Sequence, residues 1–160
     1  MIELRTLNAV DVVTIQNWPP YPPEFTELDY ALRSNGWLAE YRNRPDTWIY
    51  IAEQAGEIIA FTTLARTGDT EAEFRIALRA DMIGQKLGVI ITAMTLDKGF
   101  AEFNLACIHL IARRNNPRAI RLYQRLGFTE HGECMMNING KQVHFLRMEI
   151  ARASYAEHSG

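Results

Sequence analysis

The chain has little of what marks a disulfide-stabilised, membrane-spanning or nucleic-acid-binding protein. Its only two cysteines, Cys107 and Cys134, lack C-x-x-C spacing, which argues against a disulfide framework and a structural zinc site. Seventeen basic residues against 19 acidic ones give a formal charge of −2, so the positive field that favours non-specific nucleic-acid binding is missing. No apolar run approaches the ~18 residues of a membrane span, and no signal peptide is visible. We therefore expect a reduced, cytoplasmic protein without nucleic-acid or membrane partners.

What is present fits one folded domain. The 160 residues, 48% of them apolar and 22% charged, suffice for one core and are too few for two ordinary domains. Residues 1–150 show strand and helix periodicity throughout, and we find no repeat or linker. Residues 151–160 lose this periodicity, which predicts a flexible C-terminal tail.

The order of the expected elements predicts the fold class. Alternating or apolar runs predict seven strands, over residues 2–7, 48–52, 58–64, 72–78, 107–112, 134–137 and 143–150. Capping residues and helical periodicity predict helices after Asn8 and over residues 26–40, 84–103 and 117–125. Mostly antiparallel strands with one strand–helix–strand crossover indicate an α/β (α+β) fold, a mixed sheet of about seven strands flanked by helices.

A proline-rich stretch follows the first expected helix. Four prolines surround Tyr21 within residues 19–23, which predicts a stiff loop. Aromatic and acidic side chains gather around it. They suit either the binding of a cationic amine or the anchoring of the loop to the core, with the acids in water. The residues are Trp18, Tyr21, Glu24, Phe25, Glu27, Asp29, Tyr30 and Trp37.

The turn over residues 78–88 leaves a strand and enters a long helix. Gly84 and Gly88 would let a phosphate approach the unpaired N–H groups of the first helical turn, and Lys86 adds a positive charge. The same residues also suit an ordinary strand–helix turn, with the glycines serving a cap and close packing. The segment matches neither G-x-G-x-x-G nor the nucleotide P-loop.

A second segment, residues 116–128, predicts a short helix capped by Asn116 and ended by Gly127. Its pattern, N-x-x-A-I-x-L-Y-x-x-x-G-F, resembles the late motif of the GNAT superfamily of acetyl-coenzyme A-dependent N-acetyltransferases. Residues 72–88 are similar to the strand and pyrophosphate loop of those enzymes. The loop departs from the family pattern, since Ile83 stands where Arg or Gln is usual and Lys86 where the middle glycine is usual.

The resemblance covers about residues 2–150 and implies a single GNAT-like domain with a splayed cofactor cleft. It implies direct transfer of an acetyl group from acetyl-CoA to a primary amine, of a small molecule or a protein. An alkylamine has a pKa of about 10, so a base must remove its proton. The implied roles are Glu73 as general base, Tyr123 as general acid to the departing thiolate, and the N–H near Ala77 as oxyanion donor. Implied cofactor-binding residues are Ile76, Leu78, Ile83, Gly84, Gln85, Lys86, Gly88, Asn116 and Tyr123.

Each of these roles has a structural alternative. Glu73 also fits a solvated strand face, and Tyr123 also fits the core. The histidines and cysteines favour no metal: His109 reads as a core residue, and His131 and His144 approach one another across the last hairpin without a carboxylate cluster. Both cysteines read as packing residues.

Two other functions stay open. A non-catalytic acyl-CoA-binding regulatory module is favoured by Ile83 and Lys86 and disfavoured by Glu73 and Tyr123. A protein–protein module would use the loop over residues 18–25. The resemblance also allows a homodimer, and the sequence does not identify the amine acceptor.

Overall fold

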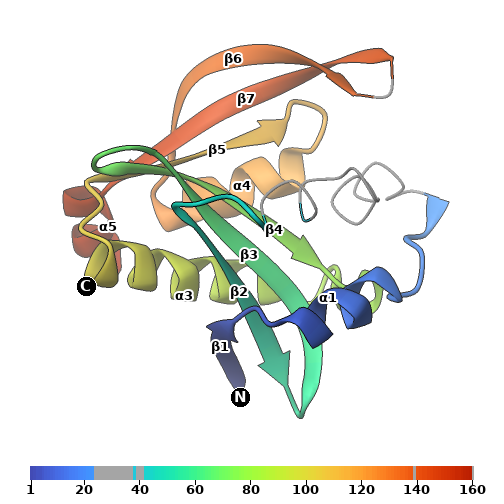
Figure 1. The fold of residues 1–160 in the computed structure, drawn as a ribbon. Helices are drawn as coiled ribbons and strands as arrows, with labels where there is room; N and C mark the ends of the chain where they lie inside the picture. The colour runs from blue at the N-terminus through green and yellow to red at the C-terminus, as the bar shows by residue number, and fades with distance from the viewer. Residues whose placement is uncertain (24–37, 39–41, 139, 160) are drawn as a thin grey trace. The chain divides into compact units, whose positions relative to one another are not determined.

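The computed structural model describes residues 1–23, 38, 42–138 and 140–159 (Figure 1). Seven strands form one mixed sheet in the order β1-β2-β3-β4-β5-β7-β6, which confirms the predicted fold class. The strands are β1 (Ile2–Thr6), β2 (Thr47–Gln54), β3 (Glu57–Gly68), β4 (Glu71–Leu78), β5 (Cys107–Arg113), β6 (Thr129–Ile138) and β7 (Lys141–Ala151). The helices are α1 (Ala9–Gln16), α3 (Leu87–Glu102), α4 (Pro117–Leu126) and α5 (Arg152–Ser159).

The helix expected over residues 26–40 lies outside the described residues, apart from Leu38. Among the described helices, none combines the length and apolarity needed to cross a bilayer. The chain divides into two compact units, one made of Met1–Arg66 with Arg75–Thr95, the other of Thr67–Phe74 with Leu96–Gly160. The division falls within β4 and α3, and each unit is described below by itself.

In the first unit, β1, β2 and β3 pair antiparallel. Ala55 and Gly56 connect β2 to β3 with φ of 55° and 80°, the left-handed pair that a tight hairpin requires. Two clusters of buried side chains make the core. One includes Ile15, Ile51, Phe61 and Ala77, and the other includes Ile59, Ala60, Leu87 and Ile91.

Helix α1 begins where the sequence predicted, because Asn8 and Asp11 form a capping box. The Asp11 N–H donates to Asn8 Oδ1 at 3.0 Å, and the Asn8 N–H donates to Asp11 Oδ2 at 2.7 Å. The same carboxylate receives two hydrogen bonds from the Arg5 guanidinium, at 2.7 and 2.8 Å. Asp11 is only 3% exposed, so this paired carboxylate joins the start of α1 to β1.

Replacing Asp11 by asparagine is expected to lower the free energy of unfolding by about 2 kcal/mol at neutral pH. The Arg5 hydrogen bonds hold the pKa of Asp11 below its ordinary value of 3.8. The stabilisation is therefore present above that value and is lost as the pH falls below about 4. Urea unfolding at several pH values measures the difference, which should close on acidification. Exposed Glu3→Gln is the control, and a difference independent of pH would contradict the ionic role.

In the second unit, β4 pairs parallel with β5 from Glu71–Cys107 to Glu73–His109, which confirms the predicted crossover. β5 pairs antiparallel with β7, and β7 with β6. β6 ends the sheet, and most of its side chains are exposed on both faces. Cys107 and Cys134 lie in β5 and β6 as free, half-buried thiols, as expected.

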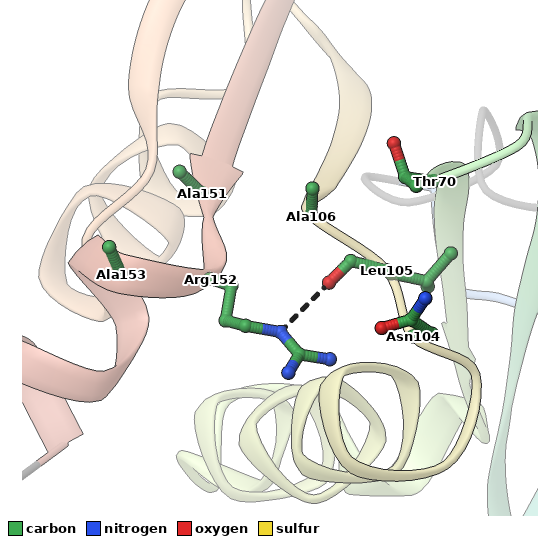
Figure 2. Close-up of a pocket in the computed structure, with 7 residues that line it drawn as sticks. All are labelled: Thr70, Asn104, Leu105, Ala106, Ala151, Arg152 and Ala153. Atoms are coloured by element: carbon green, nitrogen blue, oxygen red, sulfur yellow. Dashed lines mark hydrogen bonds between the residues drawn. The ribbon is translucent and has the colours of Figure 1, made fainter.

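The prediction of a flexible tail after residue 150 was wrong, because residues 152–159 form α5. The buried Tyr155 hydroxyl donates to Asp97 of α3, and its ring lies 5.4 Å from the Phe100 ring. Arg152 donates to the backbone carbonyl of Leu105 at 3.0 Å (Figure 2) and to that of Phe100 in the last turn of α3, where helix carbonyls lack partners within the helix. Arg152 and Tyr155 therefore anchor α5. Its apolar residues are too few to form the periodic face from which a helix could have been predicted.

Candidate active site

The loop between β4 and α3 is held together by Asp81. The Arg79 guanidinium donates to both Asp81 carboxylate oxygens, at 2.6 and 3.1 Å, and these hydrogen bonds lower the pKa of Asp81. The Gln85 side chain donates to the Asp81 carbonyl at 2.8 Å. Gln85 therefore uses its amide to close the loop, which leaves its backbone as the part able to meet a ligand.

The next residues take backbone conformations that glycine usually supplies. Gly84 has φ of 89° and Lys86 has φ of 62°. The sequence predicted that the helix begins at Gly84. Because of these backbone conformations, α3 begins at Leu87 instead. A lysine in the left-handed region costs about 1 kcal/mol more than a glycine there.

This geometry brings several predicted phosphate-binding features together. The first N–H groups of α3 have no partner within the helix, and buried Gly88 lies in that first turn. The Lys86 ammonium is exposed and makes no ion pair with any described residue. Ile83 is half-buried with an extended backbone and supplies no charge.

One edge of the β4 backbone is hydrogen-bonded to β3. The Arg79 N–H donates to the Ile59 carbonyl at 2.8 Å. Because N–H directions alternate along a strand, the Ala77 N–H also points toward β3, whereas those of Ile76 and Leu78 point away. On that second edge, the Tyr21 hydroxyl donates to the Leu78 carbonyl at 2.7 Å.

The two described aromatics of the proline-rich stretch pack into the core. Tyr21 is 7% exposed, and the Trp18 ring lies 6.0 Å from the Phe61 ring. For these two residues the structure supports anchoring, not an open amine site. The other aromatic and acidic residues named for this region lie outside the described residues: Glu24, Phe25, Glu27, Asp29, Tyr30 and Trp37.

In the second unit, α4 places Tyr123 among aromatic rings. Asn116 caps the helix by accepting from the Ala119 N–H at 3.2 Å, and Gly127 ends it with φ of 108°, both as predicted. The Tyr123 ring meets Phe74 and Phe128 edge-on, with centroids 6.4 and 5.6 Å away. Burial raises the pKa of Tyr123 above its ordinary value of 10, so the phenol keeps its proton through the neutral range.

Glu73 lies on the other face of β4 from Tyr123. Phe74 turns toward the Tyr123 ring, and neighbouring side chains on a strand point to opposite faces. Glu73 is half-buried and is the register partner of His109 on β5. His109 is 5% exposed, as expected of a core histidine, and burial lowers its pKa.

The structure does not bring His131 and His144 together as a pair. The His131 Nδ1 lies 3.1 Å from a Glu149 oxygen, and the His144 Nε2 lies 3.2 Å from a Glu133 oxygen. Each histidine thus has its own carboxylate partner. The pocket shown in Figure 2 is lined by residues 104–106 and 151–153 and by Thr70, and none of the predicted site residues lines it.

Sequence reasoning missed the contact of Tyr21 with Leu78, which joins residues 57 positions apart. It also missed the left-handed backbone of Lys86, although the replacement of a family glycine pointed to that position. No pattern in the sequence shows toward which edge of β4 the N–H groups of Ile76, Ala77 and Leu78 point, because this depends on which strand pairs with β4.

Comparison with known proteins identifies similar chains. The model of the acetyltransferase (GNAT) family matches residues 10–128. The spermidine N(1)-acetyltransferase of Escherichia coli (strain K12) is 32% identical over 114 residues, which cover 68% of this chain and 61% of that protein. The match therefore spans less than two thirds of the relative's length.

Solved structures agree over the whole fold. A chimera of spermidine N-acetyltransferase from Vibrio cholerae and hSSAT superposes with a TM-score of 0.80 at 24% identity, covering 98% of both chains. The Vibrio cholerae enzyme in complex with CoA and spermine superposes with a TM-score of 0.77 at 23% identity, covering 97% of this chain and 98% of that one. At these identities the likeness establishes the fold.

Proposed function

Since the chain belongs to the acetyltransferase (GNAT) family, we propose that it transfers the acetyl group of acetyl-CoA directly to a primary amine. The observation that carries the proposal is the setting of Tyr123. It occupies the tyrosine position of the family motif on α4, and burial raises the pKa of its phenol, which is therefore protonated at neutral and also at mildly alkaline pH. A protonated phenol suits the release of the CoA thiolate, which must gain a proton as the thioester breaks.

Glu73 is proposed as the base that takes the proton from the attacking amine, directly or through a water. Its position on the face of β4 opposite Tyr123 supports separate roles for the two residues, Glu73 as proton acceptor and Tyr123 as proton donor. The amine loses its proton on one face of the strand, and the sulfur gains one on the other. The nitrogen attacks the thioester carbonyl, the tetrahedral intermediate collapses, and the C–S bond breaks, so no covalent enzyme intermediate is needed.

The negative charge on the tetrahedral oxygen requires a preorganised donor, worth about 3 kcal/mol. We propose the N–H of Ile76 or Leu78 for this role in place of Ala77. Strand geometry turns the Ala77 N–H toward β3, whereas the two neighbouring N–H groups have no partner on that strand. The same edge of β4 suits pantetheine pairing, in the manner of an added strand.

Pyrophosphate binding is proposed for the loop over residues 83–88. Backbone N–H groups at the start of α3 favour an anion, and Lys86 supplies the charge that Ile83 lacks. Asn116 is assigned to the same cofactor site by the family motif, and its side chain serves as the helix cap.

Acetyl-CoA turnover tests the proposal. Thiol release should be measured with a panel of amines, with spermidine and spermine first because the curated relative acts on spermidine. Release that saturates with acetyl-CoA and depends on an amine is the expected result. Saturable CoA binding without turnover on any amine would instead favour the regulatory module, and absence of CoA binding would reject both. The same panel of amines identifies the acceptor, and light scattering tests whether the protein forms a homodimer.

Lys86→Ala is expected to weaken acetyl-CoA binding about tenfold at low salt and much less at high salt, because salt screens an exposed charge. Isothermal titration at two ionic strengths measures the effect. Lys98→Ala on α3, which removes an ammonium that lies 3.4 Å from the Glu102 carboxylate, is the control. Loss of affinity that does not depend on salt would show that Lys86 acts through the loop backbone and not through its charge.

A further inference from the structure

A set of metal-ligating side chains in the second unit includes none of the residues assigned to acetyl transfer. Glu71 of β4, Cys107 of β5 and Glu149 of β7 each offer one ligand atom, and these atoms all lie within 4.8 Å of one another. Glu71 and Cys107 are register partners. Glu149 of β7 is the register partner of His109, which follows Cys107 by two residues and therefore lies on the same face of β5. Strand pairing thus gathers a thiol and two carboxylates that are far apart in the sequence.

His109 provides an independent observation at this place. It is 5% exposed, and its Nδ1 has no hydrogen-bond partner, whereas Nε2 lies 2.9 Å from the Thr67 hydroxyl. Nδ1 is the ring nitrogen nearer to the β5 backbone, where Cys107 and Glu149 are its neighbours on this face. When Nε2–H donates to Thr67, Nδ1 carries a lone pair, the form in which imidazole binds a metal. Buried polar atoms rarely stay unpartnered, so this nitrogen points to a missing ligand.

We propose that Glu71, Cys107 and Glu149 bind a divalent transition-metal ion of the zinc type, beside the unpartnered Nδ1 of buried His109. Sulfur and imidazole donors select Zn²⁺ or Co²⁺ over Mg²⁺ and Ca²⁺, which prefer oxygen alone. Ligand atoms at about 2.0–2.3 Å from a tetrahedral zinc lie about 3.5 Å apart. Small rotations of the Glu71, Cys107 and Glu149 side chains would therefore bring their ligand atoms from within 4.8 Å to that spacing.

The surroundings orient Glu149 for this role. The Arg147 guanidinium donates to one carboxylate oxygen at 2.9 Å, and the His131 Nδ1 lies 3.1 Å from the other. Such contacts hold a ligand carboxylate in place, while the Arg147 charge opposes a bound cation. A bound ion would link β4, β5 and β7, and it would stabilise the folded state by mass action. The inference does not depend on acetyl transfer.

Cobalt provides the test. Protein dialysed against chelator, without acetyl-CoA or amine, is titrated with Co²⁺ alone and then with Zn²⁺ as competitor. We expect a near-ultraviolet sulfur-to-cobalt absorption band that Zn²⁺ abolishes. Cys107→Ser should lose the band, and Glu149→Gln should weaken cobalt binding at least about tenfold. Cys134→Ser, which removes the other half-buried thiol, should retain both the band and the affinity.

Absence of the band in the wild-type protein, or its persistence in Cys107→Ser, would overturn the proposal. If circular dichroism shows that Cys107→Ser does not fold, exposed Glu71→Gln takes its place. This variant should keep its fold and lose at least about tenfold in cobalt affinity, and an unchanged affinity would likewise overturn the site. Because these readouts involve no turnover, they are independent of the acetyl-transfer assay.

Discussion

Tyr123→Phe is expected to lower kcat about 100-fold while the KM for acetyl-CoA changes about twofold or less. The loss corresponds to about 2.7 kcal/mol of transition-state stabilisation. The substitution removes only the hydroxyl, so the edge-on contacts of the ring with Phe74 and Phe128 survive. The proton donor is lost and the packing is kept. Steady-state thiol release with the best amine of the panel measures both constants.

The pH profile adds a second test of this role. Because burial raises the pKa of Tyr123, the wild-type acid stays protonated at neutral and mildly alkaline pH, and no loss of rate from its ionisation is expected there. Tyr155→Phe is the matched control, since that tyrosine is also buried in the second unit and anchors α5. It should lower stability and leave kcat unchanged. An unaltered kcat in Tyr123→Phe would remove Tyr123 from the mechanism.

Glu73→Gln is expected to depress kcat/KM about 100-fold near pH 7, with the deficit shrinking as the pH approaches the amine pKa of about 10. At neutral pH nearly all of the amine is protonated, so the base contributes most. At high pH the amine is already free, and a base has little left to do. Amide and carboxylate have similar shapes, so the change mainly removes basicity.

Rates measured from about pH 6.5 to 9.5 test this expectation. Glu130→Gln on the exposed edge strand β6 is the matched control and should follow the wild-type profile. A loss of equal size at every pH would mean that Glu73 orients the substrate or supports β4 without accepting a proton.

Much of the framework followed from the sequence because its causes are local. The Asn8 and Asp11 capping box, the Asn116 cap and the Gly127 helix end each involve residues a few positions apart, and the structure shows all of them. The seven strands were likewise predicted from alternation and turn residues, whereas their order in the sheet was not. The motif over residues 116–128 placed the chain in its family before any contact was known.

The sequence predicted less well where a few distant contacts outweigh local pattern. α5 was expected to be a tail, since the two anchors that dock it, Arg152 and Tyr155, do not make a periodic face. The start of α3 was placed three residues early, because the sequence does not show that Lys86 takes a left-handed backbone.

By itself, the sequence determined the family, the order of the elements and the residue types available for acetyl transfer. Tertiary structure alone decided which peptide edge of β4 faces away from β3, how deeply Tyr123 is buried, and which carboxylates lie beside Cys107. The physical reason is that strand pairing and burial join residues tens of positions apart, and neither the direction of an N–H group nor the desolvation of a phenol is set until those partners meet.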